Sequence, residues 1–242
     1  MHNGLAALLT GSLLPLALLA CGDAPEPAAS AAQCYVPERL DLPAAATPPD
    51  RIADPPATGH VLALSWSPEF CRFRQDAPEH RGQCQNNRFG FILHGLWPQA
   101  AGSANPRACA IAPPVSEILV RTHYCMTPSA DLMQHEWSAH GTCAWDSAED
   151  YYADSARLWD RFRRPDLYGL SRKPELTAGD VRTAFAAANP DLPAGAVGID
   201  ANTRGWLQEV LICLTLEYEP RICSSNEAGE PDTRALSIWR GG

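Results

Sequence analysis

The cysteines constrain this chain more than any other feature of its sequence. Nine occur in 242 residues, and Cys21 stands apart from the rest at the end of an apolar N-terminal segment. The remaining eight form an even set, which in an exported protein indicates disulfide bonds. They are Cys34, Cys71, Cys84, Cys109, Cys125, Cys143, Cys213 and Cys223. Spacing alone does not choose among the possible pairings, but Cys71 with Cys84 and Cys213 with Cys223 are easy local pairs.

The N-terminal segment predicts export. Residues 5–20, LAALLTGSLLPLALLA, are apolar but too short and too poorly flanked for a stable membrane span. The end of this run at Cys21 resembles the bacterial lipoprotein signal, in which the cysteine is lipidated and becomes the new N-terminus. We therefore expect a signal peptide over residues 1–20, then the lipidated cysteine and a Pro/Ala-rich tether over residues 21–33. An ordinary cleaved signal is the alternative, because no Lys or Arg precedes the apolar run. The expected location is the periplasm, the membrane surface or the medium.

The rest of the chain, residues 34–242, predicts a single α+β domain. Apolar runs predict strands over residues 60–70, 89–98 and 206–220, and the RICSS segment after the last run is expected to return as its hairpin partner. Capping residues and helical spacing predict helices, which are expected over residues 115–125, 128–143, 146–164 and 176–190. The sequence shows no internal repeat and no change in amino-acid composition that would mark a second domain, so we expect one domain that disulfides hold together.

The net charge limits how the protein could bind a nucleic acid. The formal charge is −9, whereas a nonspecific coat on nucleic acid needs a positive surface. Lys173 is the single lysine of the sequence, and the other side chains counted as cationic are arginines. An RNA substrate would therefore have to be held locally in a cleft.

Residues 135–143, HEWSAHGTC, look like the zinc-protease signature HExxH with one residue too many. On a helix that turns roughly 100° per residue, His135, Glu136 and His140 share one arc, while Trp137 points away toward the core. A zinc clamp needs histidines four residues apart, but these two are five apart, and the chain has no CxxC pair. The row suits proton transfer better than metal binding, with Glu136 placed to orient His140. We expect neither a metal nor another cofactor.

A complete acid–base cycle needs a second histidine on the far side of the reacting atom. His94 is the candidate, because it lies where a predicted strand emerges into a turn beside Gly95. Two opposed histidines suit in-line phosphoryl transfer in RNA. One takes the proton of the attacking 2'-hydroxyl, and the other protonates the departing 5'-oxygen. DNA lacks this internal nucleophile.

The segments FILHGLWPQ, residues 91–99, and HEWSAHGTC resemble the two signature segments of the ribonuclease T2 family. The resemblance extends to the segment HVLALSWSPEFC. It also extends to the order of the segments and the positions of the cysteines around them, through residues 60–223. It implies an α+β fold with a central antiparallel sheet packed with helices, and a secreted endoribonuclease with several disulfides. The expected partner is RNA, the expected state is a monomer, and membrane contact is expected only through a lipid at Cys21.

The resemblance also implies a role for each residue of the two segments. His140 would be the base and His94 the acid of the first step. His135 and Glu136 would contact the phosphate and stabilise its transition state. Trp97 would position the phosphate or a base.

A further disulfide follows from the resemblance. Family members commonly pair the cysteine that ends the second segment with one that follows the first, which implies Cys109 with Cys143. The pair that is left over is Cys34 with Cys125.

One position departs from the family pattern. A lysine is expected just before the last histidine of the second segment, and this chain has Ala139. A lysine there would offer a cation to the developing negative charge, and removing one preplaced donor costs about 2.7–4 kcal/mol. An arginine from a loop could substitute, and Arg72, Arg74 and Arg88 are candidates because they adjoin the motif strands in sequence.

The leading hypothesis is a metal-independent endoribonuclease that forms 2',3'-cyclic phosphates from single-stranded RNA and then hydrolyses them. An attenuated relative that binds RNA or a protein is the second hypothesis, which Ala139 favours. A zinc-dependent hydrolase is the third. Turnover of a cyclic nucleotide separates the first two, and metal analysis of the purified protein tests the third.

Overall fold

The structure is a computed structural model, and it describes residues 1–2, 34–44, 55–102 and 104–241. Contacts divide the chain into two units, Met1–Ala31 and Ala32–Gly242. Every element named below belongs to the second unit. Apart from its first two residues, the predicted signal peptide lies outside the described residues, as do Cys21 and the predicted tether.

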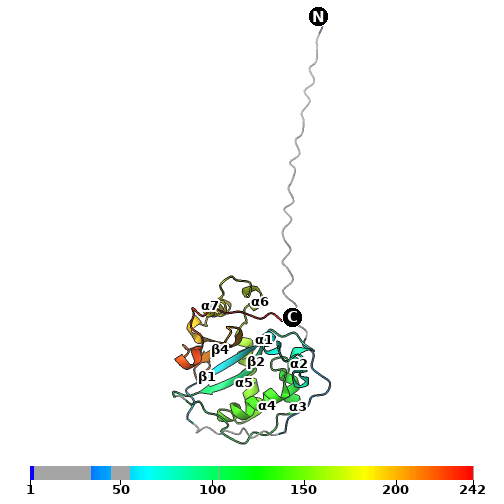
Figure 1. The fold of residues 1–242 in the computed structure, drawn as a ribbon, viewed down its shortest axis with the longest axis vertical. Helices are drawn as coiled ribbons and strands as arrows, with labels where there is room; N and C mark the ends of the chain where they lie inside the picture. Colours follow the sequence, from blue (N-terminus) through cyan, green and yellow to red (C-terminus); the bar gives the residue numbers. More distant parts are fainter. Residues whose placement is uncertain (3–33, 45–54, 103, 242) are drawn as a thin grey trace. The chain divides into compact units, whose positions relative to one another are not determined.

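A four-stranded antiparallel sheet forms the centre of the second unit (Figure 1). Its strands are β1 (Gly59–Trp66), β2 (Phe91–Gln99), β3 (Val197–Ala201) and β4 (Leu207–Leu214), in the spatial order β2-β1-β4-β3. β1 pairs with both β2 and β4, and its residues from Val61 to Leu64 are all buried. A strand that is covered on both faces needs apolar residues at successive positions, which explains the run VLAL. The predicted α+β fold with a central antiparallel sheet is confirmed.

The register of β2 against β1 shifts at His94. Ala63 pairs with Gly95 and Leu64 pairs with Leu93, so His94 has no partner of its own on β1. Such a β-bulge adds one residue to a strand and re-aims the side chain at that point. The sequence analysis expected His94 where the strand ends in a turn, and this was wrong. β2 continues past His94, and the bulge provides the change of direction.

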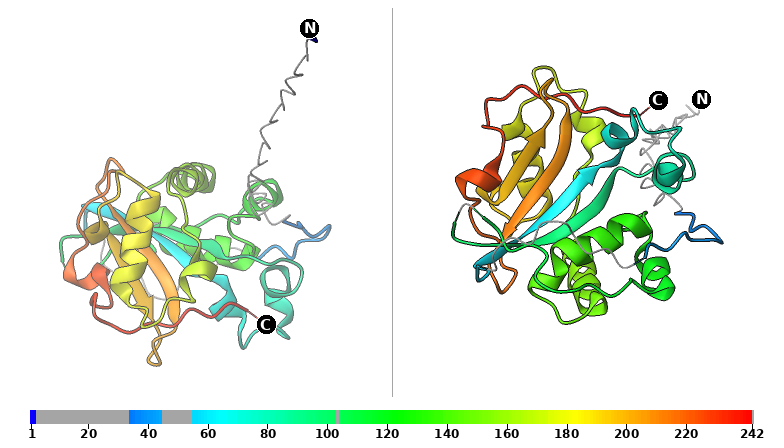
Figure 2. Two further views of the ribbon diagram at one scale, coloured as in Figure 1. Left: turned by 90° about the horizontal axis from the view of Figure 1, so that it is seen from above. Right: turned by 60° about the horizontal axis from the view of Figure 1, so that its bottom comes forward.

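Helices pack beside both edge strands of the sheet, β2 and β3. The longer ones are α3 (Glu117–His123), α4 (Ala130–Ala139), α5 (Ala148–Arg161) and α7 (Ala178–Ala188). The short helical segments are α1 (Ser67–Cys71), η1 (Pro78–His80), α2 (Arg81–Cys84), η2 (Gly141–Cys143), α6 (Leu167–Leu170), η3 (Ala194–Ala196) and α8 (Ser225–Ala228). α4 and α5 contact β2, whereas α7 contacts β3. Figure 2 shows α3, α4 and α5 gathered beside β2, with α7 behind β3 and β4.

Helix α4 begins and ends close to the predicted positions. Ser129 is its N-cap and accepts a hydrogen bond from a backbone N–H of the first turn. The helix ends at Ala139, four residues before the end of the predicted range 128–143. His140 is the C-cap: its backbone N–H still donates to the carbonyl of Glu136 at 2.9 Å, but its own conformation is no longer helical. The side chain of His140 therefore points in a different direction from the one that an ideal helix would give it.

The predicted hairpin after β4 was wrong in its second strand. The partners of β4 are β1 and β3, and the returning segment forms an isolated bridge between Leu214 and Pro220 rather than a strand. The sequence analysis missed β3, whose five residues read VGIDA. A strand this short, with a glycine and an aspartate, gives little periodic signal.

Four disulfides cross-link the described part of the chain. They are Cys34–Cys125, Cys71–Cys84, Cys109–Cys143 and Cys213–Cys223, the same pairs that the sequence analysis expects. The pair Cys109–Cys143 matters most for the site, because it joins the loop after β2 to the turn that follows α4.

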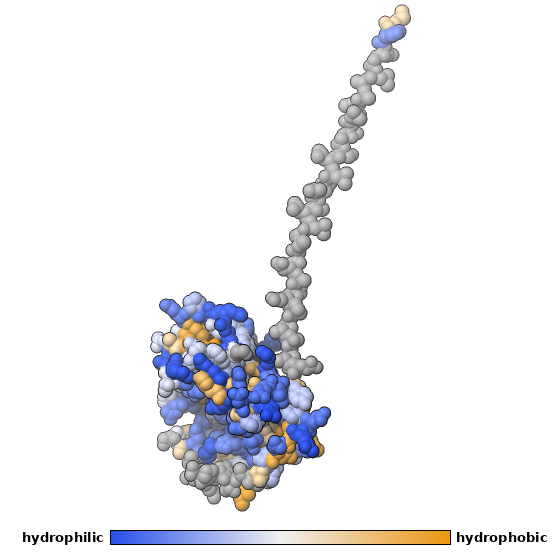
Figure 3. Space-filling model, turned by 45° about the vertical axis from the view of Figure 1, so that its right-hand side comes forward, coloured by the Kyte–Doolittle hydropathy of each residue, from blue (hydrophilic) through white to orange (hydrophobic). Residues whose placement is uncertain are grey.

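The surface drawn in Figure 3 is mostly hydrophilic, with apolar side chains in small separate groups. Large exposed apolar residues include Phe73, Ile111, Ile118 and Ile222, which come from different elements and loops. Scattered apolar residues of this kind are ordinary on a protein surface. No helix among the described residues is both long enough and apolar enough to cross a membrane.

The central strand should carry a large share of the stability. Leu62 on β1 is 0% exposed, so Leu62→Ala leaves a cavity and is expected to lower the free energy of unfolding by about 2–5 kcal/mol. Ile118 on α3 is 80% exposed, and Ile118→Ala should change it by no more than about 0.5 kcal/mol. Denaturant unfolding of both variants with disulfides intact measures the difference. Equal effects would contradict the placement of the core.

Candidate active site

Three imidazoles surround one buried carboxylate at the junction of β2 and α4. The carboxylate belongs to Glu136, whose side chain is 2% exposed. Nε2 of His94 lies 3.5 Å from its Oε1, and Nε2 of His135 lies 4.0 Å from the same oxygen. Nε2 of His140 lies 4.0 Å from Oε2. The structure thus brings together the four residues that the sequence analysis named as catalytic.

Trp97 holds this carboxylate from the side of β2. Its Nε1 donates a hydrogen bond to Oε2 of Glu136 at 2.6 Å. Its ring lies 5.1 Å from that of His94 and 5.4 Å from that of His140, measured between centroids. These contacts favour an orienting role for Trp97, beside the predicted contact with substrate.

Gly95 makes the approach of strand and helix possible. A Cβ atom at this position would lie 2.1 Å from Oε2 of Glu136 and 2.5 Å from Nε1 of Trp97. Both distances are far shorter than a van der Waals contact, so any side chain here would displace the carboxylate. The segment HGLW therefore supplies a histidine, the space for the glutamate and the donor that binds it.

The structure adds Glu209, which the sequence analysis did not single out. Glu209 lies on β4, opposite Ser65 of β1, and its Oε1 hydrogen-bonds to Nδ1 of His94 across the small serine. An acidic residue within the apolar strand LQEVLICL was the available signal, because a charged residue at a half-buried strand position usually has a partner.

Arg107 is the second addition. Its Nη1 lies 3.1 Å from Nε2 of His140, and its Nη2 lies 3.4 Å from Nε2 of His135. The signal in the sequence was indirect: Arg107 stands two residues before Cys109, which the resemblance pairs with a cysteine just after His140.

The arginines proposed from the sequence are engaged elsewhere. The guanidinium of Arg72 lies over the rings of Trp206 and Trp239, at 4.5 and 4.2 Å. Arg74 lines the pocket beside His94, but its guanidinium donates to the carbonyl of Phe70 and lies over the ring of that residue. Arg88 lines a different pocket, beside Tyr168.

Lys173, the single lysine, is also engaged. Its Nζ forms an ion pair with Asp180 at 2.7 Å, near the start of α7. It is therefore committed to a different part of the domain.

The surroundings push the pKa values of His94 and His140 in opposite directions. Burial alone would lower the pKa of His94, but the hydrogen bond to Glu209 and the charges of Glu136 and Glu209 outweigh it and raise the pKa to about 9. Burial, the charge of Arg107 and the other two histidines lower the pKa of His140 to about 3. At neutral pH one imidazole is therefore protonated and the other is neutral, which separates an acid from a base.

The remaining two groups respond to the same surroundings. Burial raises the pKa of Glu136, although the charge of His94 and the hydrogen bond from Trp97 oppose the increase. Burial and the charges of Arg107 and His94 lower the pKa of His135. Because Glu136 is buried beneath the imidazoles, the structure favours an orienting role for it over direct contact with a phosphate.

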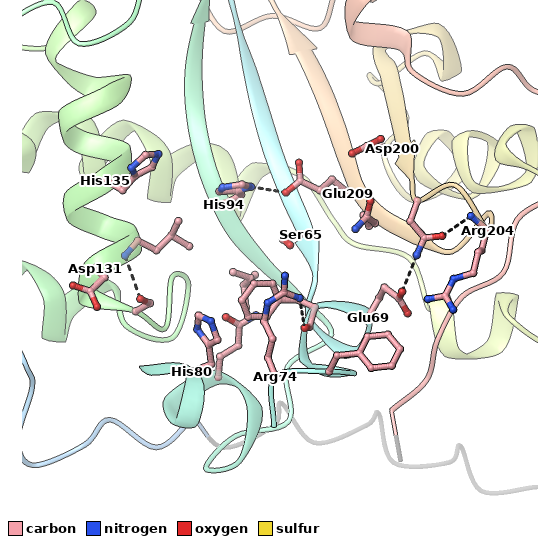
Figure 4. Close-up of a pocket in the computed structure, with 18 residues that line it drawn as sticks. Ser65, Glu69, Arg74, His80, His94, Asp131, His135, Asp200, Arg204 and Glu209 are labelled. Carbon is pink, nitrogen blue, oxygen red and sulfur yellow. Dashed lines mark hydrogen bonds and ion pairs between the residues drawn. The ribbon is translucent and has the colours of Figure 1, made fainter. Parts of the chain in front are cut away.

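A pocket of about 650 Å³ opens beside these residues (Figure 4). His94 and His135 line this pocket, and the side chain of His135 is 53% exposed. The rest of the wall combines apolar, acidic and basic side chains, including Phe70, Phe73, Asp131, Asp200, Arg74 and Arg204. In the described part of the chain, no group of three or more His, Cys, Asp or Glu side chains is arranged to hold a metal ion.

The contact with Glu209 predicts a measurable change at His94. Glu209→Gln removes the negative charge that stabilises the imidazolium, so the pKa of His94 should fall below that of the unmodified protein. Histidine-ring NMR titration measures this directly. Glu217→Gln, which removes the same charge from an exposed position after β4, is the matched control and should leave the pKa unchanged. An unchanged pKa in Glu209→Gln would show that the contact does not govern His94.

Sequence comparison finds a matching family and similar bacterial proteins. The Ribonuclease T2 family model matches residues 59–179. A probable ribonuclease of Haemophilus influenzae is 32% identical over 185 residues, which cover 72% of this chain and 63% of that protein, less than two thirds of its length. A ribonuclease of Aeromonas hydrophila is 31% identical over 188 residues, which cover 72% of this chain and 82% of that protein.

Structure comparison agrees on the fold. The solved structure of trichomaglin, described as a novel S-like ribonuclease, aligns with a TM-score of 0.61 over 75% of this chain and 98% of that chain. The sequence identity of 17% restricts this likeness to the fold. On the match of the family model and the two bacterial relatives, the chain belongs to the ribonuclease T2 family.

Proposed function

We propose that the protein is an endoribonuclease that cleaves single-stranded RNA in two steps of phosphoryl transfer, without a metal ion. Family membership and the relatives named ribonucleases support the activity. The observation that carries the mechanism is geometric: Nε2 of His94 and Nε2 of His140 lie 3.5 and 4.0 Å from the two oxygens of one buried carboxylate. The pKa shifts, upward for His94 and downward for His140, support the assignment of one as the acid and the other as the base.

In the first step the 2'-oxygen attacks phosphorus while His140 removes its proton. The new bond joins the 2'-oxygen to phosphorus, and the bond between phosphorus and the 5'-oxygen breaks. His94 gives its proton to the departing 5'-oxygen. The products are a 2',3'-cyclic phosphate and a free 5'-hydroxyl, so this step is a transesterification of the lyase type.

In the second step the two histidines exchange roles, as microscopic reversibility requires. Water attacks the cyclic phosphate, and His94, now neutral, takes a proton from it. His140, now protonated, returns its proton to the 2'-oxygen as that bond breaks. The enzyme regains its starting protonation state and releases a 3'-phosphate.

The neighbouring groups bind and orient. In this proposal His135, whose imidazole is exposed, contacts the phosphate, and Glu136 and Trp97 orient the catalytic imidazoles, which their contacts support. The pocket beside His94 offers space for a nucleoside next to the scissile phosphate. Local binding of this kind agrees with a chain whose net charge is −9.

We also propose that the protein acts as a monomer outside the cytoplasm. The four disulfides support an oxidising compartment such as the periplasm. The segment that ends at Cys21 supports a cleaved signal and a lipid anchor at that cysteine. Mass spectrometry of the mature N-terminus tests this: a diacylated Cys21 is expected, and an unmodified peptide that starts elsewhere would reject the anchor.

The activity itself predicts a simple experiment. Purified protein with EDTA should cleave RNA, accumulate 2',3'-cyclic ends and leave DNA intact. His94→Ala and His140→Ala should each lower kcat by about 10²–10⁴-fold, because each removes a proton-transfer group. His123→Ala is the control, since His123 stacks on Tyr152 and makes none of the site contacts.

A folded wild-type protein that cleaves neither RNA nor a cyclic nucleotide would instead support the attenuated relative that Ala139 suggests. Cleavage lost on EDTA treatment would favour the zinc hydrolase.

The pKa values predict the shape of the pH–rate profile for kcat/KM. The acid side should fall where His140 becomes protonated and the alkaline side where His94, with a pKa of about 9, loses its proton. Glu209→Gln lowers the pKa of His94, so it should move the alkaline side to lower pH and leave the acid side in place. A shift of the alkaline side to higher pH, or none, would contradict His94 as the acid.

A further inference from the structure

The loop that carries Arg107 is fixed against the end of α4. The backbone N–H of Ala108 donates to the carbonyl of Ala139 at 2.9 Å. The disulfide Cys109–Cys143, with a distance of 4.9 Å between its Cα atoms, ties the same loop to the turn after His140. The loop is therefore held on both sides of the base, and the position of Arg107 is set by covalent and hydrogen-bonded contacts.

Two features show that this placement is specific. Ala108 has a φ of 53°, a left-handed conformation that is unfavourable for alanine and is retained where the surroundings impose it. Ala139 is 0% exposed, and its carbonyl is the group to which the loop bonds. A lysine at position 139 would have to displace this packing, so the small residue and the arginine loop fit each other.

The guanidinium of Arg107 makes no direct contact with a carboxylate, although its charge acts on the nearby carboxylate of Glu136. Its nearest partners are Nε2 of His140 and Nε2 of His135. In the described residues, no carboxylate oxygen lies within ion-pair distance of it. A half-buried cation that faces two imidazoles is poorly compensated, and an anion placed between the three groups would satisfy it.

We propose that Arg107 is a catalytic residue, which supplies to the scissile phosphate the positive charge that the family pattern places at position 139. The inference rests on the proposed ribonuclease function and adds to it the group that stabilises the transition state. A guanidinium donates in a planar fork that matches two phosphate oxygens, which a lysine ammonium does not.

The first step can then be written with its charges. As the 2'-oxygen attacks, negative charge grows on the two non-bridging oxygens of phosphorus, and Arg107 donates N–H groups to them. In doing so the guanidinium leaves Nε2 of His140, which becomes free to accept the proton of the 2'-hydroxyl. Arg107 transfers no proton and keeps its charge throughout. Before substrate binds, the guanidinium donates a hydrogen bond to Nε2 of His140, the nitrogen that acts as the base.

The test compares kinetic constants of the full protein with its disulfides formed. The substrates are a panel of dinucleoside monophosphates, assayed with EDTA, and the variants are Arg107→Gln, Arg107→Met and Arg107→Lys. Arg88→Gln is the matched control, because Arg88 is an exposed arginine that lines a different pocket. Thermal melting and circular dichroism verify the fold of each.

Both neutral variants are expected to lower kcat by about 10²–10³-fold, as for other preplaced transition-state donors, with a smaller change in KM. Arg107→Lys keeps the charge and should retain more activity than either, while Arg88→Gln should match the wild type. Removing the charge of Arg107 also raises the pKa of His140, so the acid side of the pH–rate profile should move to higher pH. That shift reports the charge beside His140, whereas a fall in kcat with little change in KM in a folded variant reports the transition state.

The outcomes distinguish failure of the proposed ribonuclease function from failure of the role of Arg107. An inactive wild type rejects the proposed function itself. An active wild type with an equally active, folded Arg107→Gln rejects only the role of Arg107. Loss of the native fold in both Arg107→Gln and Arg107→Met would make Arg107 a structural residue and overturn the inference as well.

Discussion

The buried carboxylate of Glu136 fixes the relative positions of the other groups in the site. An isolated carboxylate in such a place is costly, so it needs donors and nearby positive charge. Trp97 gives the hydrogen bond, and His94 gives the charge. Because both come from β2 while Glu136 comes from α4, one carboxylate joins the two segments that were recognisable in the sequence. His140, at the end of the same helix, faces its second oxygen.

The opposite pKa shifts of His94 and His140 follow from what surrounds each of them. His94 contacts two carboxylates, one on each side of its ring, and these hold its proton. His140 contacts Arg107 and shares the site with two other imidazoles, which all oppose protonation. The same scaffold therefore shifts the pKa values of two histidines in opposite directions, as the proposed acid and base require. The arrangement is already present without substrate, as electrostatic preorganisation requires.

The sequence predicted the part of the site that local spacing controls. His135, Glu136 and His140 follow one another on a helix, and helix geometry is regular enough to place them on one arc. His94 was found because a second histidine was needed, but its bulge was not, since nothing local in the sequence separates a bulge from a strand end. Glu209 and Arg107 were missed for a different reason.

Their roles depend on which strand lies beside β1 and which loop a disulfide draws over α4. Strand order and loop position depend on contacts between distant residues, which hydrophobic periodicity cannot predict. The same limitation explains β3, a short strand whose pairing with β4 is decided by the finished sheet. The family resemblance supplied the fold and the pair Cys109–Cys143, yet it pointed to a lysine that this chain lacks. The arginine that faces the site comes from a loop outside both motifs.

The central claim is that His94 and His140 act on opposite sides of one phosphorus atom. A crystal structure of the protein with a nucleoside vanadate, which mimics five-coordinate phosphorus, tests this directly. The account predicts that Nε2 of His94 and Nε2 of His140 lie within about 3.2 Å of the two opposite apical oxygens. A vanadate with either imidazole out of reach, or with both on the same side, would contradict it.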